Sequence, residues 1–150
     1  MDINDTAQAF NKQSFGPDFN WGVSTAAFQT EGSCDADGKS TSIWDAFTQQ
    51  KGKVHANQNA LTACDFYNRY EQDIDIIKQL NIPNFRFSIA WTRILPEGEG
   101  EVNHAGLDFY NRVIDELEAN HIEPVVTLYH FDLPQILVDK YNGFVSRRCI

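Results

Sequence analysis

Two polar side chains that could do chemistry follow an apolar segment near residue 130. The segment Val125–Tyr129 is rich in β-branched and aromatic residues, which is typical of a strand buried on both faces. His130 follows it directly, and Asp132 precedes a Leu-Pro pair that predicts the start of a helix. Parallel α/β folds bind ligands where strands end. His130 could therefore face a ligand or be a hydrogen-bonded, half-buried histidine, and the residues alone leave both interpretations open.

Three further polar residues could act on a ligand. The Gln29 amide can donate to and accept from a hydroxyl group, although a loop glutamine is often simply solvated. Arg86 lies among aromatic residues, where a buried guanidinium would need an anionic or carbonyl partner, either at a site or in a structural ion pair. Glu31 and Asp132 could form an acid/base pair, but no spacing rule supports that interpretation.

The elements that position these residues begin with a strand and a long loop. Alternating bulky and small residues predict a short strand at Phe19–Val23. The stretch from residue 24 to about residue 61 is rich in Gly, Ser, Thr, Asp and Asn. Connections longer than about 12–15 residues are uncommon unless they are functional. Within this loop, residues 42–47 predict a short helix capped by Ser42.

Two amphipathic helices flank a second strand. Strict alternation predicts the strand Phe85–Trp91, with Arg86 and Ser88 on the face opposite Phe85. Apolar residues at three- and four-residue steps predict the helices, the second of them capped by Asn103. The two stripes consist of Phe66, Tyr70, Ile74, Ile77 and Leu80, and of Leu107, Tyr110, Val113, Ile114 and Leu117.

The order of strand, helix, strand, helix and strand predicts an α/β fold. Such alternation implies a parallel sheet with right-handed crossovers. Three parallel strands make a small sheet with two open edges. We therefore expect residues 1–150 to be an incomplete part of one larger domain.

Composition excludes several classes of partner. The net charge of -9 and the pI of about 4.7 argue against binding to nucleic acid or to an anionic membrane surface. The three cysteines form no CxxC pair and no zinc-like spacing with histidine, so we expect reduced thiols and no metal site. No segment approaches the roughly 20 apolar residues of a membrane helix, and no signal peptide is evident at the start. We expect a cytoplasmic protein.

Four motifs together resemble glycoside hydrolase family 1, the β-glucosidase family. The first is the segment from Phe19 to Gly32, which has the form of the family's N-terminal signature. The others follow in the family's order with family-like gaps: Ser42–Asp45, Arg86–Ile94 and Tyr129–Gln135. Any one of them could arise by chance, but the ordered set is specific and covers about residues 15–145.

The resemblance implies a fold and roles for matched residues. The fold would be a (β/α)8 TIM barrel, of which this chain carries the first three βα units. Gln29 and His130 would hydrogen-bond hydroxyl groups of the terminal sugar, and Arg86 would help to keep the catalytic nucleophile ionised. Phe131 stands where the family usually has tryptophan, so an aromatic wall of the substrate-binding site remains while an indole N–H donor is lost.

The resemblance also implies a reaction. Family members hydrolyse O-β-glycosides with retention, using two glutamates whose carboxyl groups stand about 5–5.5 Å apart, and need no metal or cofactor. The Asn-Glu-Pro and Glu-Asn-Gly motifs that carry those glutamates do not occur here, so no catalytic residue is expected in this chain. We expect a full-length β-glucosidase to which these residues contribute only sugar-binding groups. The alternative is a non-catalytic carbohydrate-binding relative or an inactive truncated product.

Overall fold

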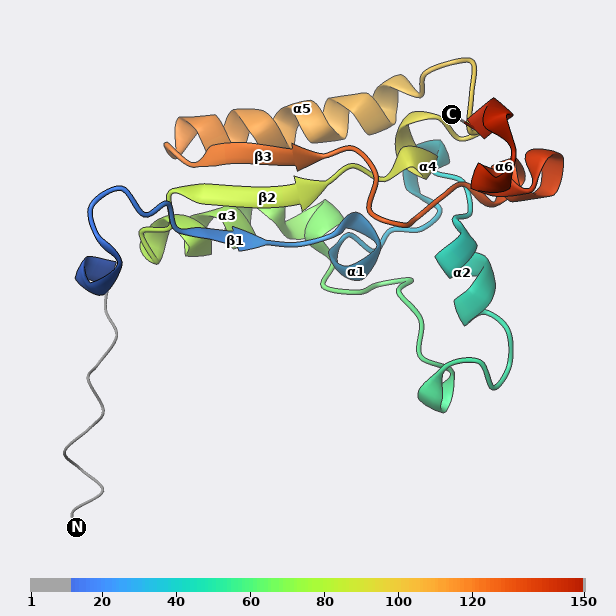
Figure 1. Ribbon diagram of the computed structural model, residues 1–150, viewed down its shortest axis with the longest axis horizontal. Coiled ribbons are helices and arrows are strands. Elements are labelled where there is room, and N and C mark those ends of the chain that lie inside the picture. Colours follow the sequence, from blue (N-terminus) through green and yellow to red (C-terminus); the bar gives the residue numbers. More distant parts are fainter. Residues whose placement is uncertain (1–11, 150) are drawn as a thin grey trace, which may run out of the picture.

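The computed structural model describes residues 12–149 and contains a parallel sheet of three strands in the order β1-β2-β3 (Figure 1). The strands are β1 (Gly22–Ser24), β2 (Asn84–Ser88) and β3 (Glu123–Thr127). The α-helices are α1 (Ala27–Thr30), α2 (Ile43–Thr48), α3 (Phe66–Gln79), α4 (Trp91–Ile94), α5 (His104–Ala119) and α6 (Gln135–Tyr141). Short 3-10 helices occupy Lys12–Phe15, Ala36–Gly38, His55–Asn57, Gly143–Val145 and Arg147–Cys149. The predicted α/β fold with a parallel sheet is confirmed.

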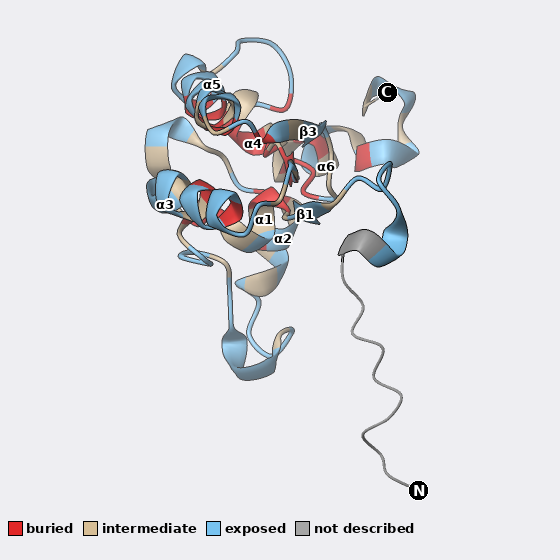
Figure 2. Ribbon diagram, turned by 90° about the vertical axis from the view of Figure 1, so that its left-hand side faces the viewer, coloured by how far each residue is buried: buried red, intermediate tan, exposed pale blue. Residues whose placement is uncertain are grey.

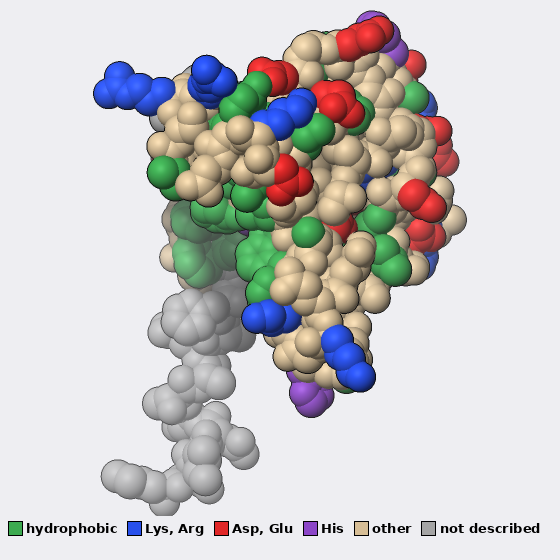
Figure 3. All heavy atoms as spheres, turned by 90° about the vertical axis from the view of Figure 1, so that its right-hand side faces the viewer, with side chains coloured by type: hydrophobic (Ala, Val, Ile, Leu, Met, Phe, Trp, Pro, Cys, Tyr) green, Lys and Arg blue, Asp and Glu red, His purple; other side chains and the backbone are tan. Residues whose placement is uncertain are grey.

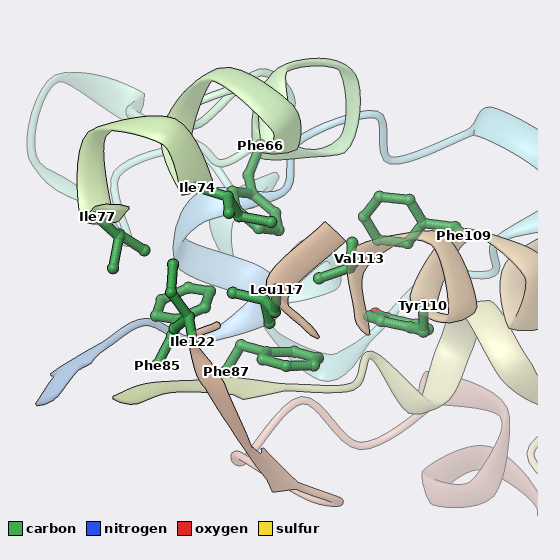
Figure 4. Close-up of a cluster of buried hydrophobic side chains, with 10 residues drawn as sticks. All are labelled: Phe66, Ile74, Ile77, Phe85, Phe87, Phe109, Tyr110, Val113, Leu117 and Ile122. Carbon is green, nitrogen blue, oxygen red and sulfur yellow. The ribbon is translucent and has the colours of Figure 1, made fainter. Parts of the chain in front are cut away.

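The core lies between the sheet and the two long helices. Helices α3 and α5 lie on the same side of the sheet (Figure 2). Phe85 and Phe87 of β2 point toward Val113 and Leu117 of α5 in the interior (Figure 4). The buried cluster consists of Phe66, Ile74, Ile77, Phe85, Phe87, Phe109, Tyr110, Val113, Leu117 and Ile122. Burial of this apolar surface is the main force that orders the sheet behind the strand ends.

The predicted apolar stripes of α3 and α5 are confirmed except at one position each. Leu80 is 61% exposed and is the C-cap residue, which follows the last residue of α3. Leu107 is 38% exposed near the start of α5.

No helix among the described residues has the length and apolar composition needed to cross a membrane.

The predicted strand Phe85–Trp91 is too long. The backbone leaves the sheet after Ser88, and Trp91 begins the single turn α4. The N–H of Ala90 donates to the Tyr110 hydroxyl at 2.7 Å, so it does not continue the ladder. The alternation of residue types therefore continues in the sequence past the end of β2, where Tyr110 of α5 replaces a neighbouring strand as the hydrogen-bond partner of Ala90.

The predicted burial of the third strand on both faces is also wrong. Val125 is 44% exposed and Val126 is 39% exposed. β3 pairs with β2 along one edge, and its other edge has no partner strand among residues 12–149. Water therefore reaches the valines of β3, although such β-branched residues are typical of a central strand.

Candidate functional site

One pocket at the ends of the strands brings together the three predicted substrate-binding residues. Gln29 follows β1 in the chain, and His130 and Phe131 follow β3. Figure 3 views the molecule from the side toward which the strands point, and hydrophobic side chains gather there around a recess. The pocket has a volume of about 240 Å³ and is lined by Ala26, Phe28, Gln29, Trp44, His130 and Phe131. Residues about 100 positions apart therefore meet where ligands bind in parallel α/β folds.

Gln29 is presented by the single turn α1. The N–H of Ala27 donates to the Ser88 hydroxyl at 2.7 Å, which attaches the start of this turn to the end of β2. Gln29 itself is exposed, and its amide has no hydrogen-bond partner among residues 12–149. An amide both donates and accepts, so this side chain is suited to a sugar hydroxyl that does the same.

His130 and Phe131 lie on a turn with an unusual backbone. Phe131 has a φ of 69°, which is costly for a bulky residue, and its side chain is 65% exposed. The ring centroid of Phe131 lies 5.6 Å from that of His130 and 5.9 Å from that of Tyr129. Exposed aromatic rings beside an imidazole form a wall on which the apolar face of a flat ligand can pack.

The residues that follow this turn are buried and fixed to the long loop. Asp132, Leu133 and Pro134 are each buried. The carbonyl of Leu133 accepts from the N–H of Ile43 at 2.8 Å, and Pro134 forms a β-bridge with Ser42. These contacts hold Phe131 in its strained conformation and join the turn to helix α2.

Helix α2 contributes Trp44 to the rim of the pocket. The predicted cap is confirmed, because the Ser42 hydroxyl accepts from the N–H of Asp45 at 3.2 Å and the Asp45 carboxylate accepts from the N–H of Ser42 at 2.9 Å. Trp44 is 41% exposed and packs 6.2 Å from Phe28 between ring centroids. Trp44 was not among the predicted site residues, since an aromatic residue on a short helix usually signals core packing.

Asn103 occupies the predicted cap position of α5 but does not cap the helix. Its amide nitrogen donates to the carbonyl of Asp37 at 2.7 Å and to that of Arg93 at 2.9 Å. The side chain thus connects the start of α5 to the segments around Asp37 and Arg93.

The predicted burial of Arg86 is wrong. Arg86 is exposed, and in the register of the sheet it lies beside Ser24 and Val125, on the face away from the core. This face is open in the described residues, so the guanidinium reaches water and forms no ion pair there. Arg86 lines a separate hollow and not the pocket that contains Gln29.

Glu31 and Asp132 have separate surroundings. Glu31 is 3% exposed, and its carboxylate accepts from Arg93 Nε at 3.2 Å, Arg93 Nη2 at 3.1 Å and the Tyr110 hydroxyl at 2.5 Å. Burial raises the pKa of Glu31, while the charge of Arg93 and the hydrogen bond from Tyr110 oppose the rise. Burial likewise raises the pKa of Asp132. No contact joins the two carboxylates in the described residues, and the structure offers no support for an acid/base pair.

Arg93 is the main site-supporting residue that the sequence did not reveal. Its side chain is fully buried, and it contacts Glu31 across 62 positions of the chain. Nothing in the local pattern around Arg93 distinguishes a buried partner of a distant glutamate from a solvated arginine.

No group of three or more His, Cys, Asp or Glu residues within 12–149 is placed to hold a metal ion.

Comparison with known proteins agrees with these features. The family model described as glycosyl hydrolase family 1 matches residues 11–150. The aryl-phospho-beta-D-glucosidase BglC of Bacillus subtilis is 48% identical over 138 residues, which are 92% of this chain and 29% of that protein. This chain thus spans about three tenths of the length of the curated relatives that it matches.

Solved structures give the same result. The crystal structure of the rice Os3BGlu6 beta-glucosidase matches with a TM-score of 0.86 and 48% identity, over 88% of this chain and 28% of that one. The Thermotoga maritima beta-glucosidase in complex with glucoimidazole matches with a TM-score of 0.80 and 53% identity, over 81% and 28%. The four motifs, the parallel sheet and the family match over residues 11–150 lead to one conclusion: the chain belongs to glycosyl hydrolase family 1.

Proposed function

We propose that the full-length protein to which this chain belongs is a β-glucosidase. It hydrolyses O-β-glycosides with retention and releases terminal glucose. This chain supplies the part of the pocket that binds the terminal sugar. The observation that carries the proposal is the pocket in which Gln29, His130 and Phe131 meet, in a chain whose relatives include proteins named as β-glucosidases.

The chemistry of the three side chains suits a sugar ring. The Gln29 amide donates to one hydroxyl and accepts from another, and the His130 ring adds a second hydrogen-bonding group. Phe131 gives the apolar C–H face of the sugar a surface to pack against. The pocket of about 240 Å³ is below the ~300–1,000 Å³ of typical small-molecule sites. Its small size is in keeping with a site whose remaining walls come from further βα units.

The proposed architecture is a (β/α)8 barrel to which residues 1–150 contribute the first three βα units. Three features support it: the parallel order of the strands, the helices on one side of the sheet, and the exposed edge of β3. In such a barrel the open face that carries Arg86 would be the interior. There its guanidinium could lie against an anionic group.

The two reacting glutamates are proposed to come from outside this chain. Glu31 is engaged by Arg93 and Tyr110, and Asp132 is buried away from the pocket lining. Neither carboxylate is free to attack or protonate a glycoside. The proposed reaction needs no cofactor, and the three free thiols support a cytoplasmic location.

Activity of the full-length protein and of residues 1–150 alone tests the proposal. We expect the full-length protein to release glucose from 4-nitrophenyl β-D-glucoside, and we expect purified residues 1–150 to release none. Absence of turnover by the full-length protein on any aryl β-glycoside would contradict a glycosidase. Turnover by residues 1–150 that disappears in Gln29→Ala would show instead that the chain contains its own catalytic groups.

A further inference from the structure

The turn that carries Gln29 cannot hold its position without support. Helix α1 has four residues, and isolated helices shorter than about 12–15 residues are marginal in water. No side chain caps its start. The orientation of the Gln29 amide therefore depends on contacts that α1 makes with other elements.

The start of α1 is attached to strand β2. The N–H of Thr25 donates to the carbonyl of Arg86 at 2.9 Å, and the N–H of Ala27 donates to the Ser88 hydroxyl at 2.7 Å. Both contacts precede Gln29. They fix where the turn begins and make no contact with its far end.

The far end is held by Glu31, which immediately follows the turn. Its carboxylate accepts one hydrogen bond from Tyr110 and two from Arg93. The carbonyl of Glu31 also accepts from the N–H of Tyr67 at 3.1 Å. Buried charge-assisted hydrogen bonds are shorter and stronger than neutral ones, so this anchor is stiff.

The partners of Glu31 are themselves fixed. The Tyr110 hydroxyl donates to Glu31 and accepts from the N–H of Ala90 at 2.7 Å, so it joins α1 to the exit of β2. The Arg93 guanidinium lies 4.1 Å from the centre of the Tyr67 ring. The three side chains of Glu31, Arg93 and Tyr110, here called the anchor cluster, thus connect Gln29 to the core beneath helix α5.

We propose that the anchor cluster positions Gln29 for hydrogen bonding to the terminal sugar. This inference rests on the proposed function. Glu31, Arg93 and Tyr110 touch no sugar. They act through the Gln29 amide, because they fix the position of the end of α1 relative to the ends of the strands. A role limited to stability would give a different pattern, since loss of the cluster would then affect the enzyme equally with or without the Gln29 amide.

A double-mutant cycle in the full-length protein separates the two roles. Tyr110→Phe removes one hydroxyl, and Glu31→Gln removes the charge, so a second variant remains if one of them fails to fold. Each is combined with Gln29→Ala, and kcat and KM are measured with 4-nitrophenyl β-D-glucoside. Val113→Ala serves as the control. Val113 lies in the same core and on the same helix as Tyr110, but its side chain forms no hydrogen bond with the anchor cluster.

We expect Tyr110→Phe to lower kcat/KM by about tenfold, the factor that corresponds to roughly one misplaced hydrogen bond. In the Gln29→Ala background the same change should cost less than about twofold, because there is no amide left to position. Val113→Ala should change kcat/KM by less than about twofold in either background.

Two results would overturn the inference, and they differ. If Tyr110→Phe and Glu31→Gln reduce kcat/KM by the same factor with and without the Gln29 amide, the anchor cluster is only structural while the proposed function stands. If the wild-type protein does not turn over β-glucosides, the proposed function fails and the inference fails with it.

Discussion

Phe131 is the residue at which the pocket departs most from ordinary chain geometry. Its φ of 69° is unfavourable for an aromatic residue, yet the buried residues that follow it and their bonds to the α2 segment hold it there. The ring consequently stands 65% exposed at the rim. An exposed aromatic ring with room around it can be enlarged without disturbing the core.

Phe131→Trp is therefore predicted to strengthen sugar binding. The substitution keeps the aromatic wall and adds an indole N–H donor. One additional neutral hydrogen bond is worth about 0.5–1.5 kcal/mol, which is roughly a twofold to tenfold decrease in KM for an aryl β-glucoside. Phe47→Trp is the matched control, because Phe47 is 39% exposed on α2 and does not line the pocket. Equal KM values for Phe131→Trp and Phe47→Trp would contradict the placement of residue 131 at the sugar.

Asp132 gives a prediction about pH. Its Oδ1 atom is buried without a hydrogen-bond partner among the described residues, and burial raises the pKa of the carboxyl above its usual value of 3.8. Between 3.8 and the raised pKa the folded state binds more protons than the unfolded state, so the free energy of unfolding falls as pH rises and then levels off. Asp132→Asn lacks this titration.

Thermal unfolding of both proteins across the acidic range tests that sign. The stability of the wild type relative to Asp132→Asn should decrease as pH rises from the usual aspartate range through the raised pKa. Unfolding midpoints that run parallel in the two proteins, or that diverge in the opposite direction, would show that the folded state does not favour the protonated acid.

At the scale of elements, helix α5 can approach the segment around Arg93 only because it carries a glycine. A Cβ atom built on Gly106 would lie 2.2 Å from the carbonyl oxygen of Arg93. Alanine is ordinarily favoured over glycine in a helix by about 1 kcal/mol. Here the close packing of α5 against the backbone at Arg93 reverses that preference.

Gly106→Ala is predicted to destabilise the protein by about 1–3 kcal/mol, the usual cost of overpacking. Asn111→Ala, an exposed position of the same helix, should shift stability by no more than about 0.5 kcal/mol. The midpoint of thermal unfolding measures both. If Gly106→Ala unfolds at the temperature of Asn111→Ala, the tight contact between α5 and Arg93 does not exist in solution.

At the scale of the whole molecule, the sheet is covered on one face and open at the other face and at the β3 edge. The exposed residues there include Val125, Val126 and Leu128, and Leu128 is 77% exposed. Long exposed strand edges are sites of pairing with further strands. This asymmetry matches a chain that spans about three tenths of its relatives.

Local pattern was sufficient for some features of this molecule. The stripe of α5 and the Ser42 cap depend on residues close in sequence, so both could be predicted. The placement of Gln29 and His130 in one pocket was expected from the family resemblance, and it agrees with the rule that ligand sites lie where parallel strands end. The exposure of Arg86 and Val125 could not be predicted, because it depends on whether another strand or face covers them. The contact of Glu31 with Arg93 could not be predicted either, since it joins residues that share no local pattern.

The proposed function requires above all that Gln29 and His130 hydrogen-bond the hydroxyl groups of the terminal sugar. The direct measurement is kcat/KM of the full-length protein, of Gln29→Ala and of His130→Ala, with 4-nitrophenyl β-D-glucoside and with its monodeoxy analogues. We predict that each substitution lowers kcat/KM for the glucoside by at least about tenfold. We also predict that the loss shrinks to less than about twofold for the analogue lacking the hydroxyl that the side chain binds. Undiminished losses across every deoxy analogue, or full activity of both variants on the glucoside, would contradict the claim.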